Sequence, residues 1–109
     1  LMNKFNLKEF TRGWFVGNFN PSLIKTNDVE VGVKEYKAGD YEEFHHHKVS
    51  TEITCITKGE VEMNGIRYKA GDIIEIKPLE GTDFKAITDS QNVVIKIPGA
   101  NNDKYLGEA

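Results

Sequence analysis

Apolar residues occupy every second position in several short stretches of the chain. This alternation covers the stretches 29–33, 61–63, 66–68, 74–76, 84–86 and 93–97. Because successive side chains of a strand point to opposite faces, a period of two predicts half-buried strands. Gly, Asn, Asp and Pro separate these stretches at intervals of roughly ten residues, which favours a β-sandwich or a β-barrel. We therefore expect an all-β fold.

One turn is predicted in detail. Asn64-Gly65 lies between the stretches 60–63 and 66–69. These two residue types tolerate the positive φ that both central positions of a two-residue hairpin loop require. We expect a β-hairpin here.

The two ends of the chain lack the regular alternation of the middle. The segment around Trp14 predicts an early strand, and helix is expected only within residues 3–11. A chain of 109 residues is long enough for one hydrophobic core. We expect a single domain over 1–109, with a barrel core at about 29–97, an N-terminal strand and extension at 1–28, and a C-terminal tail at 98–109.

Composition excludes several classes of function. The net charge is −3 and the basic residues are scattered, so we expect no nucleic-acid partner. No apolar run is long enough to cross a bilayer, and the N-terminus lacks the apolar core of a secretory signal, so we expect no membrane role and a cytoplasmic location. Cys55 is the only cysteine, which rules out an intrachain disulfide.

The three histidines of the chain are consecutive, and Glu52 follows them closely. On a strand, His45 and His47 point to the same face, about 6.6 Å apart, while His46 points to the other. The short segment 48–51 is expected to turn the chain back, so that Glu52 begins an antiparallel neighbour and lies beside the two imidazoles. We predict that His45, His47 and Glu52 bind one divalent metal ion.

This ligand set also suggests which metals are suitable. Two imidazoles and one carboxylate leave coordination positions open for water or substrate, as in non-haem iron and catalytic zinc sites. We expect Fe, Mn, Ni or Zn. Three adjacent histidines alone would be read as an exposed polar patch, but the surrounding glycines and Glu52 favour a site.

The spacing of these residues resembles the cupin superfamily. Gly39, five residues, His45, one residue, His47, four residues, Glu52, six residues and Gly59 match the complete first motif of that family. The resemblance covers about residues 29–97 and implies a jelly-roll β-barrel with the metal inside. It also implies a small-molecule ligand.

The second cupin motif is only partly present, in residues 71–81. Each of the two spacers around Pro78 is one residue longer than usual. Phe84 stands where cupins usually supply a third histidine as fourth ligand. Phe84 is expected either to plug the barrel or to form an apolar wall of the substrate pocket, and Asp83 and His46 are poor substitutes for the missing ligand.

Three functions fit these residues. The first is a metal-dependent small-molecule enzyme of the oxygenase, isomerase or lyase type. The second is a non-catalytic barrel that binds a sugar-like or other small ligand. The third is a metal-independent, epimerase-type cupin, for which His45 with Glu52 is the only plausible acid–base pair.

Strand alternation places Ile53 and Cys55 on the face opposite Glu52. An apolar outward face suggests a cover, either the N-terminal strand near Trp14 or a second subunit. We expect a homodimer.

Overall fold

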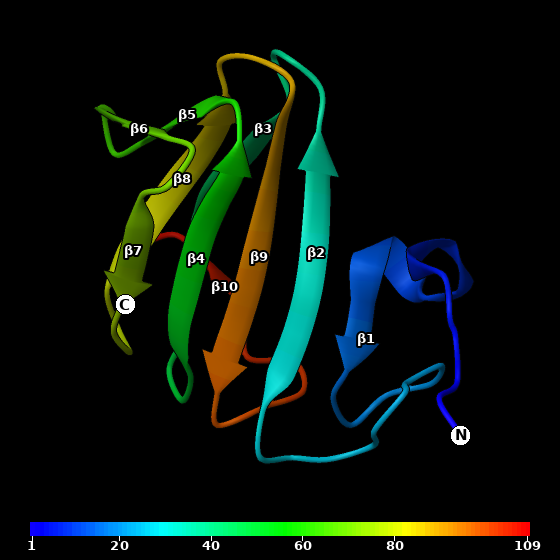
Figure 1. Ribbon diagram of the computed structural model, residues 1–109. Helices are drawn as coiled ribbons and strands as arrows, with labels where there is room; N and C mark the ends of the chain where they lie inside the picture. The colour runs from blue at the N-terminus through cyan, green and yellow to red at the C-terminus, as the bar shows by residue number, and fades with distance from the viewer.

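The computed structural model describes residues 1–109 as two five-stranded sheets that face each other (Figure 1). All strand pairs within the sheets are antiparallel. The first sheet has the order β1-β2-β9-β4-β7, with β1 (Trp14–Val16), β2 (Glu30–Tyr36), β9 (Ser90–Ile97), β4 (Thr51–Lys58) and β7 (Ile73–Ile76).

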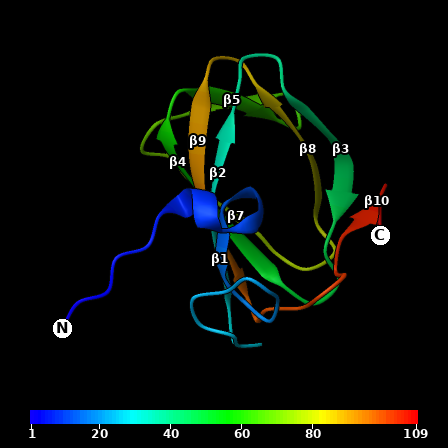
Figure 2. The same ribbon diagram turned by 90° about the vertical axis from the view of Figure 1, so that its right-hand side faces the viewer.

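The second sheet has the order β10-β3-β8-β5-β6. Its strands are β10 (Tyr105–Leu106), β3 (Tyr41–His46), β8 (Gly81–Ala86), β5 (Glu60–Met63) and β6 (Ile66–Lys69). Consecutive strands such as β3 and β4 therefore belong to opposite sheets, and the chain crosses repeatedly between them (Figure 2). The expected all-β jelly-roll barrel is confirmed, and no helix in it is both long and apolar enough to span a membrane.

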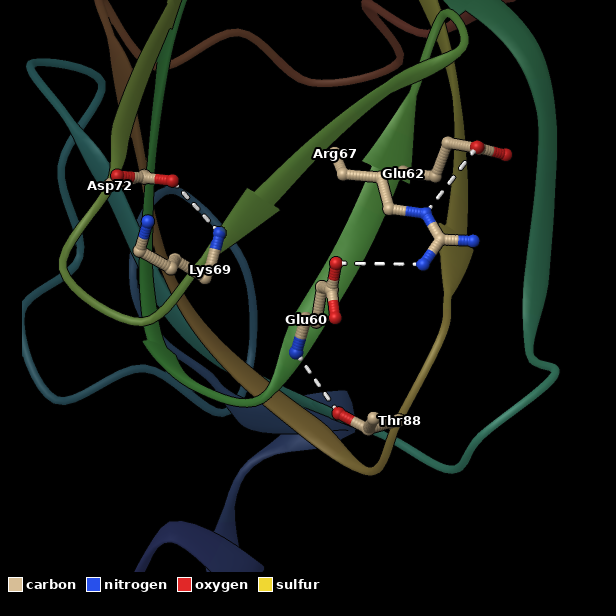
Figure 3. A network of polar contacts seen from close by, with 6 residues as sticks. All are labelled: Glu60, Glu62, Arg67, Lys69, Asp72 and Thr88. Carbon is tan, nitrogen blue, oxygen red and sulfur yellow. Dashed lines mark hydrogen bonds and ion pairs between the residues drawn. The ribbon is translucent and has the colours of Figure 1, made fainter.

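The predicted hairpin joins β5 and β6. Met63 pairs with Ile66, and Asn64 and Gly65 both have positive φ, of 51° and 77°. Its exposed face has a polar network in which Arg67 lies 3.6 Å from Glu60 and 4.0 Å from Glu62 (Figure 3). Such exposed ion pairs contribute little to stability. Arg67 therefore points outward and takes no part in the barrel interior.

The hydrophobic core fills part of the barrel interior, between the two sheets. It consists of six buried side chains: Ile56, Val61, Met63, Ile76, Phe84 and Ala86. Most of them come from β4, β5 and β8, where the alternation of apolar residues places them on the inner face. The rest of the interior is lined by polar side chains, which form the site described below.

The first sheet is apolar on its outer face as well. Val33 on β2, Ile53 on β4 and Ile95 on β9 are half-buried and alternate with inward residues. In Figure 1 this face is turned toward the viewer, and no element lies in front of β4 and β9. Val33 shares a surface hollow with Leu7 and Phe10 of the N-terminal segment. The expectation that the N-terminal strand covers Ile53 is wrong, because β1 pairs with the far edge of β2 and is separated from β4 by two strands.

The N-terminal extension closes one side of the barrel. Two short 3₁₀ turns, η1 (Leu7–Glu9) and η2 (Thr11–Gly13), precede β1. The indole of Trp14 packs directly on Gly32 of β2, where a Cβ atom would come within 2.7 Å of the ring. Glycine at this position therefore lets Trp14 lie flat against the sheet, at the edge of the cavity that it helps to line.

Candidate metal centre

A cavity of about 440 Å³ lies between the two sheets. This volume suits a small-molecule ligand. All four residues predicted to form a site line it: His45, His47, Glu52 and Phe84. The structure therefore brings together side chains from β3, β4 and β8 around one space.

The orientation of His45 favours a role as a ligand. The ring lies at the end of β3 and is buried. Its Nδ1 is 2.8 Å from the carbonyl oxygen of Glu43. Because a carbonyl can only accept, Nδ1 carries the proton and donates, which leaves the Nε2 lone pair of the neutral ring free.

His47 lies directly after β3, and its ring centroid is 5.7 Å from that of His45. Its carbonyl accepts a hydrogen bond of 2.7 Å from the backbone N–H of Leu79, which fixes this part of the chain. The buried Nε2 atom has no hydrogen-bond partner. Burial, together with the charge of Lys96, lowers the pKa of His47 to about 4, so the ring is neutral at pH 7.

His46 faces away from the cavity, as its strand parity predicts. Its Nδ1 donates a 2.7 Å hydrogen bond to the carbonyl of Gly107, and its ring stacks on Tyr105 at 5.5 Å. Both partners belong to the C-terminal segment around β10, which pairs with β3. His46 therefore attaches the C-terminal segment to the histidine strand.

The same C-terminal segment holds the loop after His47. The buried carboxylate of Asp103 accepts hydrogen bonds of 2.9 to 3.2 Å from the backbone N–H groups of Lys48, Val49 and Ser50. Burial tends to raise the pKa of Asp103, but these three donors outweigh it and the pKa lies below its usual value. We call residues 103–107 the C-terminal strap.

Glu52 reaches the cavity by a different route from the one predicted. Its strand, β4, is not the antiparallel neighbour of β3 but belongs to the opposite sheet, where it pairs with β9 and β7. The loop 48–50 therefore crosses between sheets instead of forming a hairpin. Glu52 faces the histidines across the barrel interior and accepts a 3.0 Å hydrogen bond from the Thr54 hydroxyl.

Two imidazole nitrogens and a carboxylate are suitable ligands for a divalent ion, and all three side chains line the cavity. The three donors do not, however, converge on one point. No three His, Cys, Asp or Glu side chains lie close enough together to hold one ion in the arrangement that the structure shows. The unpartnered Nε2 of His47, the free Nε2 of His45 and the cavity-facing carboxylate of Glu52 are the donors available.

Phe84 lies at the border between the hydrophobic core and the cavity. It is a member of the hydrophobic core and also lines the cavity. Its ring lies 4.5 Å from that of Tyr36. Burial, followed by the charges of Glu42 and Glu52, raises the pKa of Tyr36 above its usual value.

Sequence reasoning missed several residues of the cavity wall. Lys34 and Lys96 line it together with Trp14, and Asn92 and Glu30 are buried beside them. The signal was their shared parity on β2 and β9. The alternating valines and isoleucines of those strands predict two faces but do not indicate that the polar one is enclosed.

Neither a protein-family model nor a curated protein matches this sequence. Among solved structures, the chain is similar to a double-stranded β-helix protein from Klebsiella pneumoniae, with 26% identity over 97% of this chain and 92% of that chain and a TM-score of 0.72. An RmlC-like cupin from Desulfovibrio desulfuricans matches at 19% identity over 92% of this chain and 100% of that chain, with a TM-score of 0.65.

An enzyme is also among the matches. Oxalate decarboxylase from Bacillus subtilis, described with Mn(II) centres, is 18% identical over 73% of this chain, with a TM-score of 0.59. The match spans 24% of that longer chain. At these identities the likeness shows the fold, which is that of the double-stranded β-helix and RmlC-like cupin structures.

Proposed function

We propose that this cupin-fold protein binds one divalent transition metal through His45, His47 and Glu52 and uses it as a small-molecule enzyme. The observation that carries the proposal is the buried, unpartnered Nε2 of His47 in a cavity shared with His45 and Glu52. A buried polar atom without a partner is costly. Coordination to a cation would satisfy this nitrogen.

The surroundings of the three donors support the proposal. His45 is held in the tautomer that a ligand needs, and the low pKa of His47 keeps its ring neutral at pH 7. The Glu52 carboxylate has a hydrogen-bond donor of its own in Thr54. The side chains would have to rearrange to complete the set, because the three donors do not converge on one point.

A bound metal with open positions would supply Lewis-acid or oxygen chemistry. The residues around the metal site would exclude water and bind the substrate. The core residue Phe84 excludes water from one side of the cavity. Tyr36 is protonated at neutral pH, as tyrosines ordinarily are, and its raised pKa extends this to more alkaline pH, so its hydroxyl offers a hydrogen-bond donor to a substrate. Oxygenase, isomerase and lyase reactions are all compatible with this arrangement.

The comparisons support the metal in a general way. The oxalate decarboxylase that shares this fold is described with Mn(II) centres. That protein is an enzyme, so the fold accommodates both a metal and catalysis.

Elemental analysis of tag-free protein tests the proposal. Purified protein should contain close to one equivalent of Fe, Mn, Ni or Zn, and H47Q and E52Q should lose most of it. Matched controls are H46Q, whose imidazole faces the other way, and E75Q, an exposed carboxylate on the outer side of β7. Metal content that is equal in H47Q and H46Q would contradict the assigned ligand set.

The non-catalytic barrel remains the second candidate, favoured by the unconverged donors. Thermal-shift measurements against a panel of small metabolites, with and without EDTA, separate the two. Stabilisation that survives EDTA favours the binding barrel, because a ligand of the native state raises apparent stability without the metal.

A further inference from the structure

Two lysines lie on the inner face of the first sheet, beside the candidate metal donors. Lys34 comes from β2 and Lys96 from β9, and both line the cavity. Their Nζ atoms lie 5.7 Å and 5.1 Å from the centre of the Trp14 ring. Both ammonium groups therefore contact the same indole ring through cation–π interactions.

Neither ammonium group forms a direct ion pair with a carboxylate, although Glu30, Glu42 and Glu52 line the same cavity. The only ion pairs within 4.0 Å are those of Arg67 on the exposed hairpin. Lys96 is paired in register with Glu30 on one side and Glu52 on the other. The Glu30 carboxylate is occupied by the backbone N–H of Ala100 at 2.8 Å, and that of Glu52 by Thr54.

The pKa of Lys34 reflects its partly buried position near other charges. Its Nζ has one partner, the carbonyl oxygen of Arg12 at 3.1 Å. Burial lowers its pKa most, the carboxylate of Glu42 raises it, and the charges of Arg12, Lys104 and Lys96 lower it, so that the pKa lies below its usual value. All three of these basic residues also line the cavity. Four basic side chains therefore line the cavity together with three carboxylates, those of Glu30, Glu42 and Glu52, and no ion pair within 4.0 Å joins the two sets. The excess of positive charge at the lysines favours an anion there.

We propose that the cavity recognises a small organic anion, whose carboxylate or phosphate group binds between Lys34 and Lys96 beside Trp14. This deepens the proposed function, on which it rests, because it gives the substrate a charge class. Lys96 is the direct cross-strand neighbour of Glu52, so their Cβ atoms are about 5 Å apart. A molecule held at the lysines therefore extends naturally toward the metal donors.

Trp14 is the only tryptophan of the chain, so its fluorescence reports on this place alone. The experiment titrates EDTA-treated protein with malonate and with inorganic phosphate at constant ionic strength, and uses malonamide as the neutral control. The expected result is a saturable change of Trp14 emission with at least one of the two anions and none with malonamide. The absence of a saturable change with both anions would overturn the proposal.

Variants assign the effect to the lysines. K96Q and K34Q should each weaken binding of the anion by about tenfold or more, whereas K96R should retain it. K85Q is the matched control, because Lys85 is exposed on β8 and lies outside the cavity. Circular dichroism verifies that each variant is folded. Equal affinity in K96Q and K85Q would overturn the role of Lys96.

The two proposals fail in different ways. Anion binding by EDTA-treated wild-type protein that contains no metal as purified would overturn the metal site and support the anion site. Stoichiometric metal in the purified protein, without any fluorescence response to the anions, would support the metal site and overturn the anion site. K96Q should keep the metal content of the wild type, since an ammonium group is not a ligand.

Discussion

The barrel interior has two regions of opposite character, although the same strands build both. β4 contributes Ile56 to the apolar core and Glu52 to the polar cavity, four residues apart on one inner face. β8 contributes Ala86 to the core and Thr82 to the cavity. The core gains stability from burial of apolar surface, whereas the cavity retains buried polar atoms without partners. The comparison indicates that one region stabilises the fold and the other forms the site.

The largest expected effect concerns the core. I56A removes a fully buried side chain and leaves a void, which should lower the free energy of unfolding by about 2 to 5 kcal/mol. Chemical denaturation measures this loss. Metal content and anion affinity per folded molecule should not change. If I56A lost metal content in parallel with its free energy of unfolding, the core and the cavity would not be independent.

The next effect concerns the C-terminal strap. D103A leaves three backbone N–H groups of the loop 48–50 without their acceptor, which should cost about 2 to 3 kcal/mol. Unlike I56A, this variant should also weaken metal binding, because the loop follows His47 directly. Titration of metal-free protein with Zn²⁺ or Mn²⁺ measures it. Metal affinity equal to that of the wild type would show that the strap serves only the fold.

A smaller effect is expected from pH, through His47. Its pKa is about 4 in the folded protein and about 6.5 in an unfolded chain. Between these values the unfolded state binds more protons, so stability falls as pH falls below 6.5. From pH 7 to pH 5.5 the loss should be about 1 kcal/mol in metal-free protein. Urea unfolding of the wild type and of H47Q at both pH values measures it, and an equal loss in H47Q would contradict the assignment.

The smallest effect on stability concerns the outer face of the first sheet. I53S changes a half-buried residue on that face and should cost less than the core variant, about 1 kcal/mol. If two copies of the chain associate through this face, as predicted from the sequence, the variant should shift sedimentation from dimer toward monomer. Sedimentation unchanged by I53S would place any dimer contact elsewhere.

The positions of the strands were predictable from the sequence. For some strands the sequence did not reveal which face points into the barrel. Alternation identified β5 and β8 together with their buried sides, because Val61 and Phe84 point to the core. On β2 and β9 the same rule failed for the faces: Val33 and Ile95 lie outside, whereas Lys34 and Lys96 lie inside. A period of two distinguishes two faces of a strand without saying which one is enclosed.

The candidate site was predictable where it depends on neighbours along the chain. The shared direction of His45 and His47 follows from alternation at the end of β3, where His47 comes directly after the strand, and both do line the cavity. The position of Glu52 in the opposite sheet depends on the crossing of the chain between sheets, which a short loop does not reveal. The strap was missed for the same reason, since Asp103 acts on residues more than fifty positions away.

That separation has a consequence for how the site forms in time. The segment His46 to Ser50 is held by contacts with Asp103 and Gly107 that close loops of 53 to 61 residues. Contacts that close long loops form late in folding, and short terminal strands open first in the native state. Hydrogen exchange should therefore find the amides of Val49 and Ser50 opening more readily than those of β4 and β9. Opening of the strap would thus expose the loop next to His47 while the two sheets stay folded.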